Sequence, residues 1–239
     1  MKIPYIVFSI VTLILFLSAP AYSEVRFYDA ISLKDKSVML RAETKGKIFS
    51  KGGEMVEFLV NGRSIGKVLS GGDGFAFKQF SPTETGLYKI SVISGKDKDR
   101  GLLLSLEKGT RVVCIDAGGS MFLPLSMEPL KGSQKIIKAI SKRFPIIYLQ
   151  TEMFDITAIK KLLEKNEFIS APVLSWENGA VFDDINKKGL KIKFIIGSAS
   201  VIESAKEFKP KAFSFEEVEG AEEVKDWEEI GKKLNLVIK

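Results

Sequence analysis

The chain lacks histidine altogether and holds one cysteine among its 239 residues. The absence of histidine excludes Ser-His-Asp and Cys-His catalysis and removes the commonest transition-metal ligand. A single cysteine, Cys114, permits neither an intramolecular disulfide nor a cysteine-based zinc site. Because Cys114 lies in the apolar run VVCI, we expect a small buried hydrophobic residue rather than a reactive thiol.

The chain also has little excess charge of either sign. Its formal net charge is +6 at pH 7, and acidic and basic residues are interspersed, as in KDKDR at 96–100. No basic cluster contains interleaved aromatic residues, so we expect no nucleic-acid partner. With 45% hydrophobic and 28% charged residues, the composition is that of a globular protein.

The first 23 residues have the pattern of a secretory signal peptide. Residues 6–17 are almost wholly apolar, and Ala21 and Ser23 are small residues suited to cleavage before Glu24. We therefore predict an exported protein, periplasmic or secreted, with no integral membrane span after cleavage. The alternative is an uncleaved anchor, although the apolar stretch is short for a span of about 20 residues.

Residues 24–106 show the pattern of an all-β domain. Segments of alternating or apolar residues occur at 38–44, 54–70, 75–80, 87–94 and 102–106. Asn61-Gly62 predicts a hairpin turn, and we interpret the polar stretch 95–101 as another turn. Short strands at this spacing favour a β-sandwich.

Within this half, KGGEMVEFLVNGRSIGKVLSGGDGFAFKQFSPTETGLYKISV resembles a bacterial immunoglobulin-like domain. The resemblance rests on an NG hairpin, a DG-x-A strand and a P-x-x-x-G-x-Y corner. A positive φ angle is expected at Gly62, Gly74 is expected to start a strand after a tight loop, and Tyr88 is expected to bond the backbone as a tyrosine corner. The resemblance implies a spacer or a partner-binding surface.

Residues 107–239 alternate between strand and helix patterns. Expected strands are 111–115, 145–149, 171–176, 191–197 and 211–215. Expected helices are 132–144, 156–166, 200–208 and 224–234, with Ser133 and Asp155 as N-caps of the first two. The alternation predicts a multidomain protein whose second domain is an α/β, Rossmann-like parallel sheet with helices on both faces.

In such a sheet the ligand crevice lies beyond the carboxyl ends of the strands. The residues that follow the strands here are polar or small: Asp116, Gln150-Thr151, Ser175 and Gly197-Ser198. We expect these residues to line one crevice.

The same residues resemble the haloacid-dehalogenase superfamily of phosphatases. VVCIDAGGS is similar to its first motif, hhhDxDxT, with Asp116 in place, Gly118 where the second aspartate belongs, and Ser120 for the threonine. The resemblance implies that Asp116 would be the nucleophile and a ligand of Mg²⁺. Gly118 cannot supply the acid–base step, which is typically worth 10²–10⁴-fold.

The other motifs of that superfamily are also degenerate. PIIYLQTE places Gln150 at the motif threonine, followed by Thr151, and FIIGSASVIESAK has Ser198 and Ile202 at two acidic positions. The motif lysine is not assigned; the alternatives are Lys187, Lys188, Lys191 and Lys193. An immunoglobulin-like segment before such a domain is also similar to lipins, which implies a phosphatidate-like ligand.

Together these features predict a pseudo-phosphatase that is not catalytic. It would bind a phosphorylated or anionic small molecule or lipid, or support an envelope protein partner. The predicted ligand-binding residues are Gly118, Gly119, Ser120, Gln150, Thr151 and Ser198. Gly118-Gly119 would form a loop with positive φ angles, or a backbone anion nest.

Two alternatives to this hypothesis stay open. One is a divergent phosphohydrolase that uses Asp116 and Mg²⁺. The other is an envelope or adhesion module that acts through the sandwich. For Asp116 itself, a structural role as a turn cap is as well supported by the sequence as a ligand role.

Overall fold

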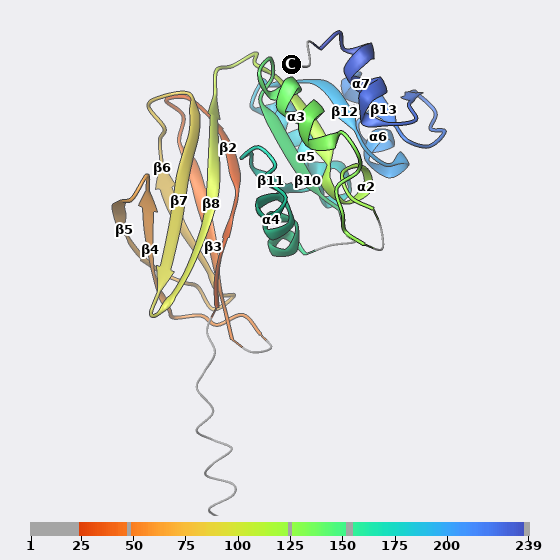
Figure 1. Cartoon of the computed structure of the whole chain (residues 1–239). Helices are drawn as coiled ribbons and strands as arrows, with labels where there is room; N and C mark the ends of the chain where they lie inside the picture. Colours follow the sequence, from red (N-terminus) through yellow and green to blue (C-terminus); the bar gives the residue numbers. More distant parts are fainter. Residues whose placement is uncertain (1–23, 47–48, 124–125, 152–154, 237–239) are drawn as a thin grey trace, which may run out of the picture.

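The computed structural model describes residues 24–46, 49–123, 126–151 and 155–236, and the predicted signal segment lies outside them. An all-β half and an α/β half lie side by side (Figure 1). Among the helices of the described residues, none combines the length and apolar character that a membrane crossing requires.

The all-β half is a sandwich of two sheets. The three-stranded sheet has the antiparallel order β1 (Glu24–Tyr28), β3 (Val38–Lys45), β6 (Phe75–Phe80). The five-stranded sheet has the order β2 (Ala30–Leu33), β8 (Asp97–Leu106), β7 (Gly86–Ser94), β4 (Met55–Val60), β5 (Arg63–Leu69).

Alternating side chains from both sheets form the sandwich core, which includes the fully buried Phe27, Leu40 and Phe58. The hydroxyl of Tyr88 accepts from the Glu84 amide at 2.9 Å and lies 3.2 Å from its carbonyl oxygen, so the expected corner is present. Gly62 has a φ of +82°, as expected, and Gly74, also at +82°, directly precedes strand β6. The sandwich prediction is thus confirmed.

The predicted turn at 95–101 is wrong, because β8 begins at Asp97 and pairs with β7 along its whole length. Lys98 and Arg100 of this segment are exposed, whereas the carboxylate of Asp99 accepts from the Phe27 amide at 2.7 Å. The short strands β1 and β2 were also not predicted.

The α/β half contains six parallel strands. Their order is β11 (Val173–Ser175), β10 (Ile146–Gln150), β9 (Arg111–Asp116), β12 (Lys191–Ile196), β13 (Lys211–Ser214), β14 (Ala221–Glu223). The helices are α2 (Ala117–Ser120), α3 (Ser133–Ser141), α4 (Ile156–Lys165), α5 (Ala180–Lys187), α6 (Ala199–Ser204) and α7 (Trp227–Lys233). Two 3₁₀ turns, η1 (Glu177–Gly179) and η2 (Lys206–Phe208), flank α5 and α6. The predicted parallel sheet is confirmed.

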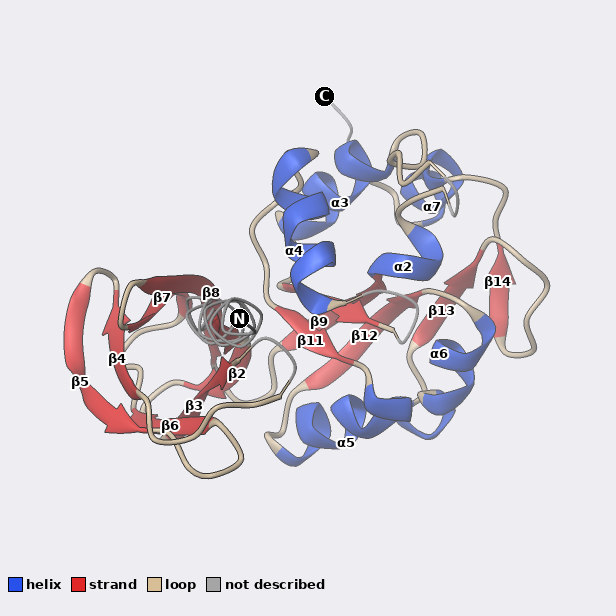
Figure 2. Ribbon diagram, turned by 90° about the horizontal axis from the view of Figure 1, so that it is seen from below, coloured by secondary structure: helices blue, strands red, loops and turns tan. Residues whose placement is uncertain are grey.

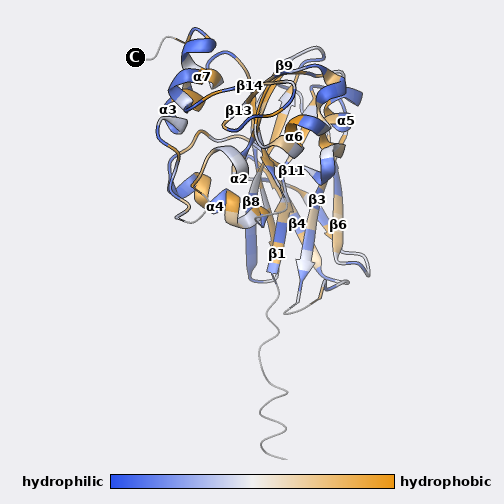
Figure 3. Cartoon of the chain, turned by 90° about the vertical axis from the view of Figure 1, so that its right-hand side faces the viewer, coloured by the Kyte–Doolittle hydropathy of each residue, from blue (hydrophilic) through white to orange (hydrophobic). Residues whose placement is uncertain are grey.

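Helices cover both faces of this sheet (Figure 2). Val113 and Ile115 of β9 pack with α3, α4 and α7, whereas Val112 and Cys114 pack with α5 and α6. Figure 3 shows apolar residues along the inner strands, and hydrophilic together with apolar residues on the helices that cover them. Cys114 is fully buried, as expected for a small packing residue. Burial raises the pKa of its thiol to about 12.

Two expectations about helix termini had different outcomes. Asp155 caps α4, accepting from the amide of Thr157 at 2.8 Å. Ser133 does not cap α3: it is the first helical residue, Gly132 holds the N-cap position, and the Ser133 hydroxyl is buried without a partner among the described residues. Helix α5 and strand β14 lie in segments where no element was expected.

The two halves share one apolar cluster. Ile31 of β2 and Leu104 and Leu106 of β8 pack in the same cluster as Val112 and Cys114 of β9. Strand β8 leads directly into β9, so the predicted boundary at 106/107 falls in the short connection between them. The sandwich and the α/β half are therefore packed against each other rather than only linked.

Candidate functional site

The carboxyl ends of β9 and β12 meet at the point where the strand order reverses. Strand β9 is followed in sequence by β10 and β11 on one side, and β12 to β14 lie on the other side. Asp116 ends β9, Thr151 follows β10, and Ser198 follows β12. The sheet thus brings the predicted residues to one corner, at the position where ligands bind in many open parallel sheets.

At this corner Asp116 is enclosed by hydrogen-bond donors. Its Oδ1 accepts from the Gly119 amide at 3.0 Å and from the Thr151 hydroxyl at 3.3 Å. Its Oδ2 accepts from the Ser198 hydroxyl at 2.8 Å and from the Ser198 amide at 3.3 Å. The residue is 0% exposed. Both carboxylate oxygens are therefore committed to donors of the chain itself.

Two glycines allow this close packing. A β-carbon at Gly119 would overlap Oδ2 of Asp116, and one at Gly197 would lie 2.9 Å from the Asp116 β-carbon. Neither Gly118 nor Gly119 has a positive φ, so the expected positive-φ loop is wrong, while the alternative anion nest stays a prediction. The two glycines instead lie in the single helical turn α2, where the side chain of Asp116 is the N-cap and accepts from the Gly119 amide.

The remaining predicted residues are engaged with backbone groups. The buried hydroxyl of Ser120 donates to the Asp116 carbonyl at 2.6 Å, and the amide of Gln150 donates to the Thr151 carbonyl at 2.6 Å. Ser198 occupies the N-cap position of α6, yet its hydroxyl bonds Asp116 and makes no capping bond.

One contact at this corner was missed by sequence reasoning. Trp227 donates from its indole nitrogen to the Ser120 carbonyl at 2.9 Å. No local sequence signal links it to a turn more than one hundred residues earlier.

The corner does not fit the Mg²⁺ ion that the resemblance implies. Magnesium takes an octahedral set of oxygen ligands and is usually held by one or two carboxylates. Among the described residues no group of three or more acidic, cysteine or histidine residues lies close enough to hold a metal. Asp116 already accepts four hydrogen bonds from the chain itself, and the described residues offer no acidic cluster around it, so we derive no metal-dependent step.

The four lysines that are alternatives for the motif lysine lie at the opposite end of the sheet, near the amino-terminal ends of its strands. Lys191 and Lys193 are on the first residues of β12, and Lys187 and Lys188 end α5 just before that strand. Lys193 is five residues before Ser198, roughly 16 Å along an extended strand. None of them is placed to contact a group bound at Asp116.

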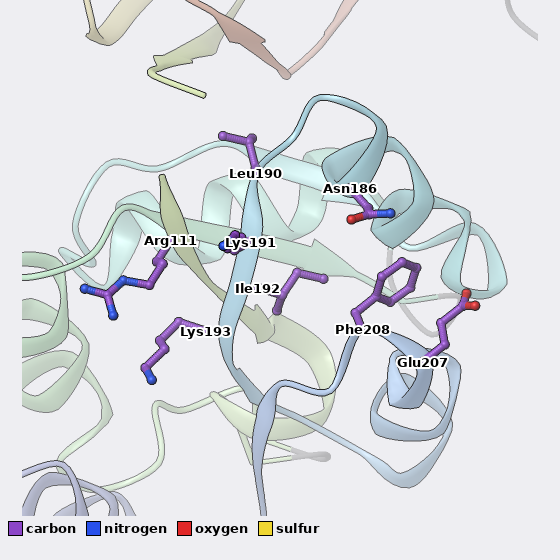
Figure 4. Close-up of a pocket in the computed structure, with 8 residues that line it drawn as sticks. All are labelled: Arg111, Asn186, Leu190, Lys191, Ile192, Lys193, Glu207 and Phe208. Atoms are coloured by element: carbon purple, nitrogen blue, oxygen red, sulfur yellow. The ribbon is translucent and has the colours of Figure 1, made fainter. Parts of the chain in front are cut away.

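A hollow of about 510 Å³ at that amino-terminal edge is lined by Arg111 and by Lys191 and Lys193 (Figure 4). Arg111 and Lys193 point to one side of β12, whereas Ile192 and Phe208 lie on the other. Because its charged side chains do not converge, this hollow is not a built anion site.

Comparisons with known proteins give limited similarity. No protein-family model matches the chain, and no curated protein matches it by sequence. A titin domain matches 36% of this chain and 99% of its own, at 13% identity and a TM-score of 0.29. A C-terminal fragment of intimin matches 46% of this chain and 40% of its own, at 11% identity and a TM-score of 0.31.

A carbohydrate acetylesterase from Xanthomonas citri matches 81% of this chain and 60% of its own, at 10% identity and a TM-score of 0.32. Immunoglobulin-like all-β domains thus occur among solved structures similar to part of the chain. With TM-scores this low, the likenesses carry no argument about function. None of the three is a haloacid-dehalogenase-type domain, so that resemblance stays a prediction.

Proposed function

We propose that this protein is an exported, non-catalytic binding protein whose α/β half is a degenerate haloacid-dehalogenase-like domain. One observation carries the proposal: Asp116, the single carboxylate left at the motif positions considered, is fully buried and its oxygens are occupied by four donors. A nucleophile must reach a phosphorus atom, and a carboxylate enclosed in this way is a structural tie between β9, β10 and β12.

The surrounding contacts support the same proposal. A phosphoryl group at this corner would face the Asp116 carboxylate without a cation between them, and like charges at short range repel. The hydroxyl of Ser120 is bonded to the backbone of the same turn rather than directed outward. Anion binding, which the sequence also suggested, is therefore better supported elsewhere on the molecule.

The test is a phosphatase assay on the protein purified after secretion, with an aryl phosphate substrate and with or without Mg²⁺. The expected result is equal turnover by the unchanged protein and by the Asp116→Asn variant, at the background level. In the variant an amide N–H replaces one acceptor and faces a donor, so the free energy of unfolding should fall by about 1–3 kcal/mol. Magnesium-dependent turnover that disappears in Asp116→Asn would refute the proposal.

Export is the second part of the proposal. It is supported by the pattern of residues 1–23, an apolar stretch followed by the small residues Ala21 and Ser23 before Glu24. Mass spectrometry of the protein expressed from the full chain in a secreting host should show a mature form that begins at Glu24. A secreted or membrane fraction that keeps residues 1–23 would instead indicate the uncleaved anchor.

A further inference from the structure

A groove of about 830 Å³ runs between the two halves of the molecule. One wall is the outward face of β7 and β8, and the other is α4 with the chain that leads to β11. Small-molecule sites usually measure about 300–1,000 Å³ and occur preferentially at domain interfaces. The groove therefore has the size and the place of a ligand site.

The floor of the groove is tied by one buried aspartate. Asp29, with its side chain 2% exposed, lies 2.7 Å from the ammonium group of Lys160 on α4. It also accepts from the amide of Leu102 on β8 and from the amide of Val173 on β11, each at 2.9 Å. Because these contacts join both walls, the groove is formed before any ligand enters, which lowers the entropic cost of binding.

The sandwich wall carries three cations without an ion-pair partner among the described residues: Lys89, Lys98 and Arg100. Arg100 lies opposite Ser91 in the β7–β8 ladder, and Lys89 lies opposite Leu102. Lys98 and Arg100 are two residues apart on one strand and so share a face. All three are exposed, and the alternation of the strands directs them to the same side.

The opposite wall is largely apolar. Leu163 and Phe168 are buried in the core beneath it, and Ile169 is partly exposed at its surface. Glu164 is the exposed carboxylate of this wall. The residues that line the groove thus include four cations, with Lys160 counted, and two carboxylates, those of Asp29 and Glu164. A positive wall that faces an apolar wall is complementary to a molecule with an anionic head and an apolar part.

We infer that this groove binds a small amphiphilic anion, with its phosphate or carboxylate head against Lys89, Lys98 and Arg100 and its apolar part against Ile169. The guanidinium of Arg100 is suited to two parallel hydrogen bonds to either head group. The inference rests on the proposed non-catalytic function and names the ligand class and the place for it, away from Asp116.

The experiment is calorimetric titration of the secreted protein with octyl phosphate below its micelle-forming concentration. Inorganic phosphate and octyl glucoside serve as probes of the head and the chain alone, and octanoate tests the other head group. We expect saturable binding of octyl phosphate that weakens as salt rises, and at least about tenfold weaker binding of either partial probe.

Variants locate the site. Lys98→Gln with Arg100→Gln should weaken octyl phosphate binding at least about tenfold, because each removes a charged hydrogen bond. Ile169→Ala should weaken octyl phosphate binding while leaving the binding of inorganic phosphate unchanged. The control pair is Lys135→Gln with Lys138→Gln, which removes the same charge from exposed positions on α3 outside the groove; it should change the affinity less than twofold.

The outcomes separate the two proposals. No binding of octyl phosphate, binding unaffected by the Lys98 and Arg100 changes, or binding only to vesicles of phosphatidylglycerol and phosphatidylcholine would overturn the groove as a small-molecule site. None of these results would create phosphatase activity, so the proposed absence of catalysis would stand. Magnesium-dependent turnover lost in Asp116→Asn would refute the proposed function whatever the groove binds.

Discussion

Two buried aspartates hold distant parts of this chain together, and they differ in how they do so. Asp116 accepts only from uncharged donors at one corner of the parallel sheet. Asp29 combines a lysine with two backbone amides and joins the two halves. Burial raises the pKa of Asp29, while Lys160 and the two amides act in the opposite direction.

The Asp29→Ala variant tests how much these Asp29 contacts contribute to the free energy of unfolding. Removing the carboxylate leaves the Lys160 ammonium and two amides without their partner, and breaking a buried pair in this way costs about 3–5 kcal/mol. Urea unfolding at pH 7 should show a loss of that size. The control Asp183→Ala, at an exposed position of α5, should change the free energy by about 0.5 kcal/mol or less. A loss as small as the control's would show that Asp29 is not a significant tie.

A second ion pair between the halves gives a pH dependence. Burial acts to raise the pKa of Asp155, but the Thr157 amide and Arg26, at 2.9 Å, outweigh it, so the pKa lies below its ordinary value. The unfolded chain therefore binds this proton more readily than the folded chain. The stabilisation is complete above the ordinary pKa, about 3.9, and is lost as the pH falls through the lowered value.

Asp155→Asn should remove this part of the acid sensitivity while keeping the N-cap of α4. Because the Asp155 side chain is 52% exposed, the pair should contribute at most about 1 kcal/mol. Urea midpoints at pH 7, 4.5 and 3 are compared for the unchanged protein and the variant. The variant should lose less stability on acidification; an equal loss in both proteins would contradict the assignment.

At the scale of elements, periodicity predicted most strands and helices, because their buried faces repeat every two or about 3.6 residues. Periodicity failed to predict a strand where the segment is rich in charged residues. The segment 97–101 is rich in charged residues, yet β8 extends through it because its hydrogen bonds come from β7. It also missed β1 and β2, which are short and have partners distant in sequence.

At Gly101, strand β8 has no room for a side chain because neighbouring residues pack closely against it. A β-carbon there would overlap Oδ1 of Asp29 and the ring of Phe27, so Gly101→Ala should cost about 1–3 kcal/mol through displaced packing. Gly72→Ala is the matched control, since nothing lies within 4 Å of its β-carbon position. Thermal unfolding of the two variants should separate them by several degrees. Equal melting temperatures would indicate that β8 relaxes freely.

The site at the carboxyl ends could be predicted only in part. Asp116, Thr151 and Ser198 were expected to meet because they follow neighbouring parallel strands, and they do. The sequence could not predict that both Asp116 oxygens would be fully hydrogen-bonded by these residues, because this depends on side-chain directions and on how deeply Asp116 is buried. The groove could not be foreseen either, because its walls come from segments far apart in sequence.

For the molecule as a whole, the shared apolar cluster argues for one cooperative unit. Ile31, Leu104 and Leu106 of the sandwich lose their cover if the α/β half unfolds alone, and exposing apolar surface costs about 25 cal/mol per Å². The Asp29 and Arg26 contacts add to this coupling.

Urea unfolding should therefore follow a single transition. Trp176 and Trp227 report the α/β half by fluorescence, while far-ultraviolet circular dichroism reports both halves. Coincident curves would support one unit. A fluorescence transition that precedes a second, purely β transition would show that the halves unfold independently.

The buried position of Cys114 has a practical consequence for measuring such openings. Its thiol is fully buried on β9, in the apolar cluster with α5 and α6, and its raised pKa leaves almost no thiolate in the folded state. An alkylating reagent can modify it only in molecules that have opened, so the labelling rate counts the open population under native conditions. The chain thus contains its own single-site reporter of rare unfolding, and no engineered probe is needed.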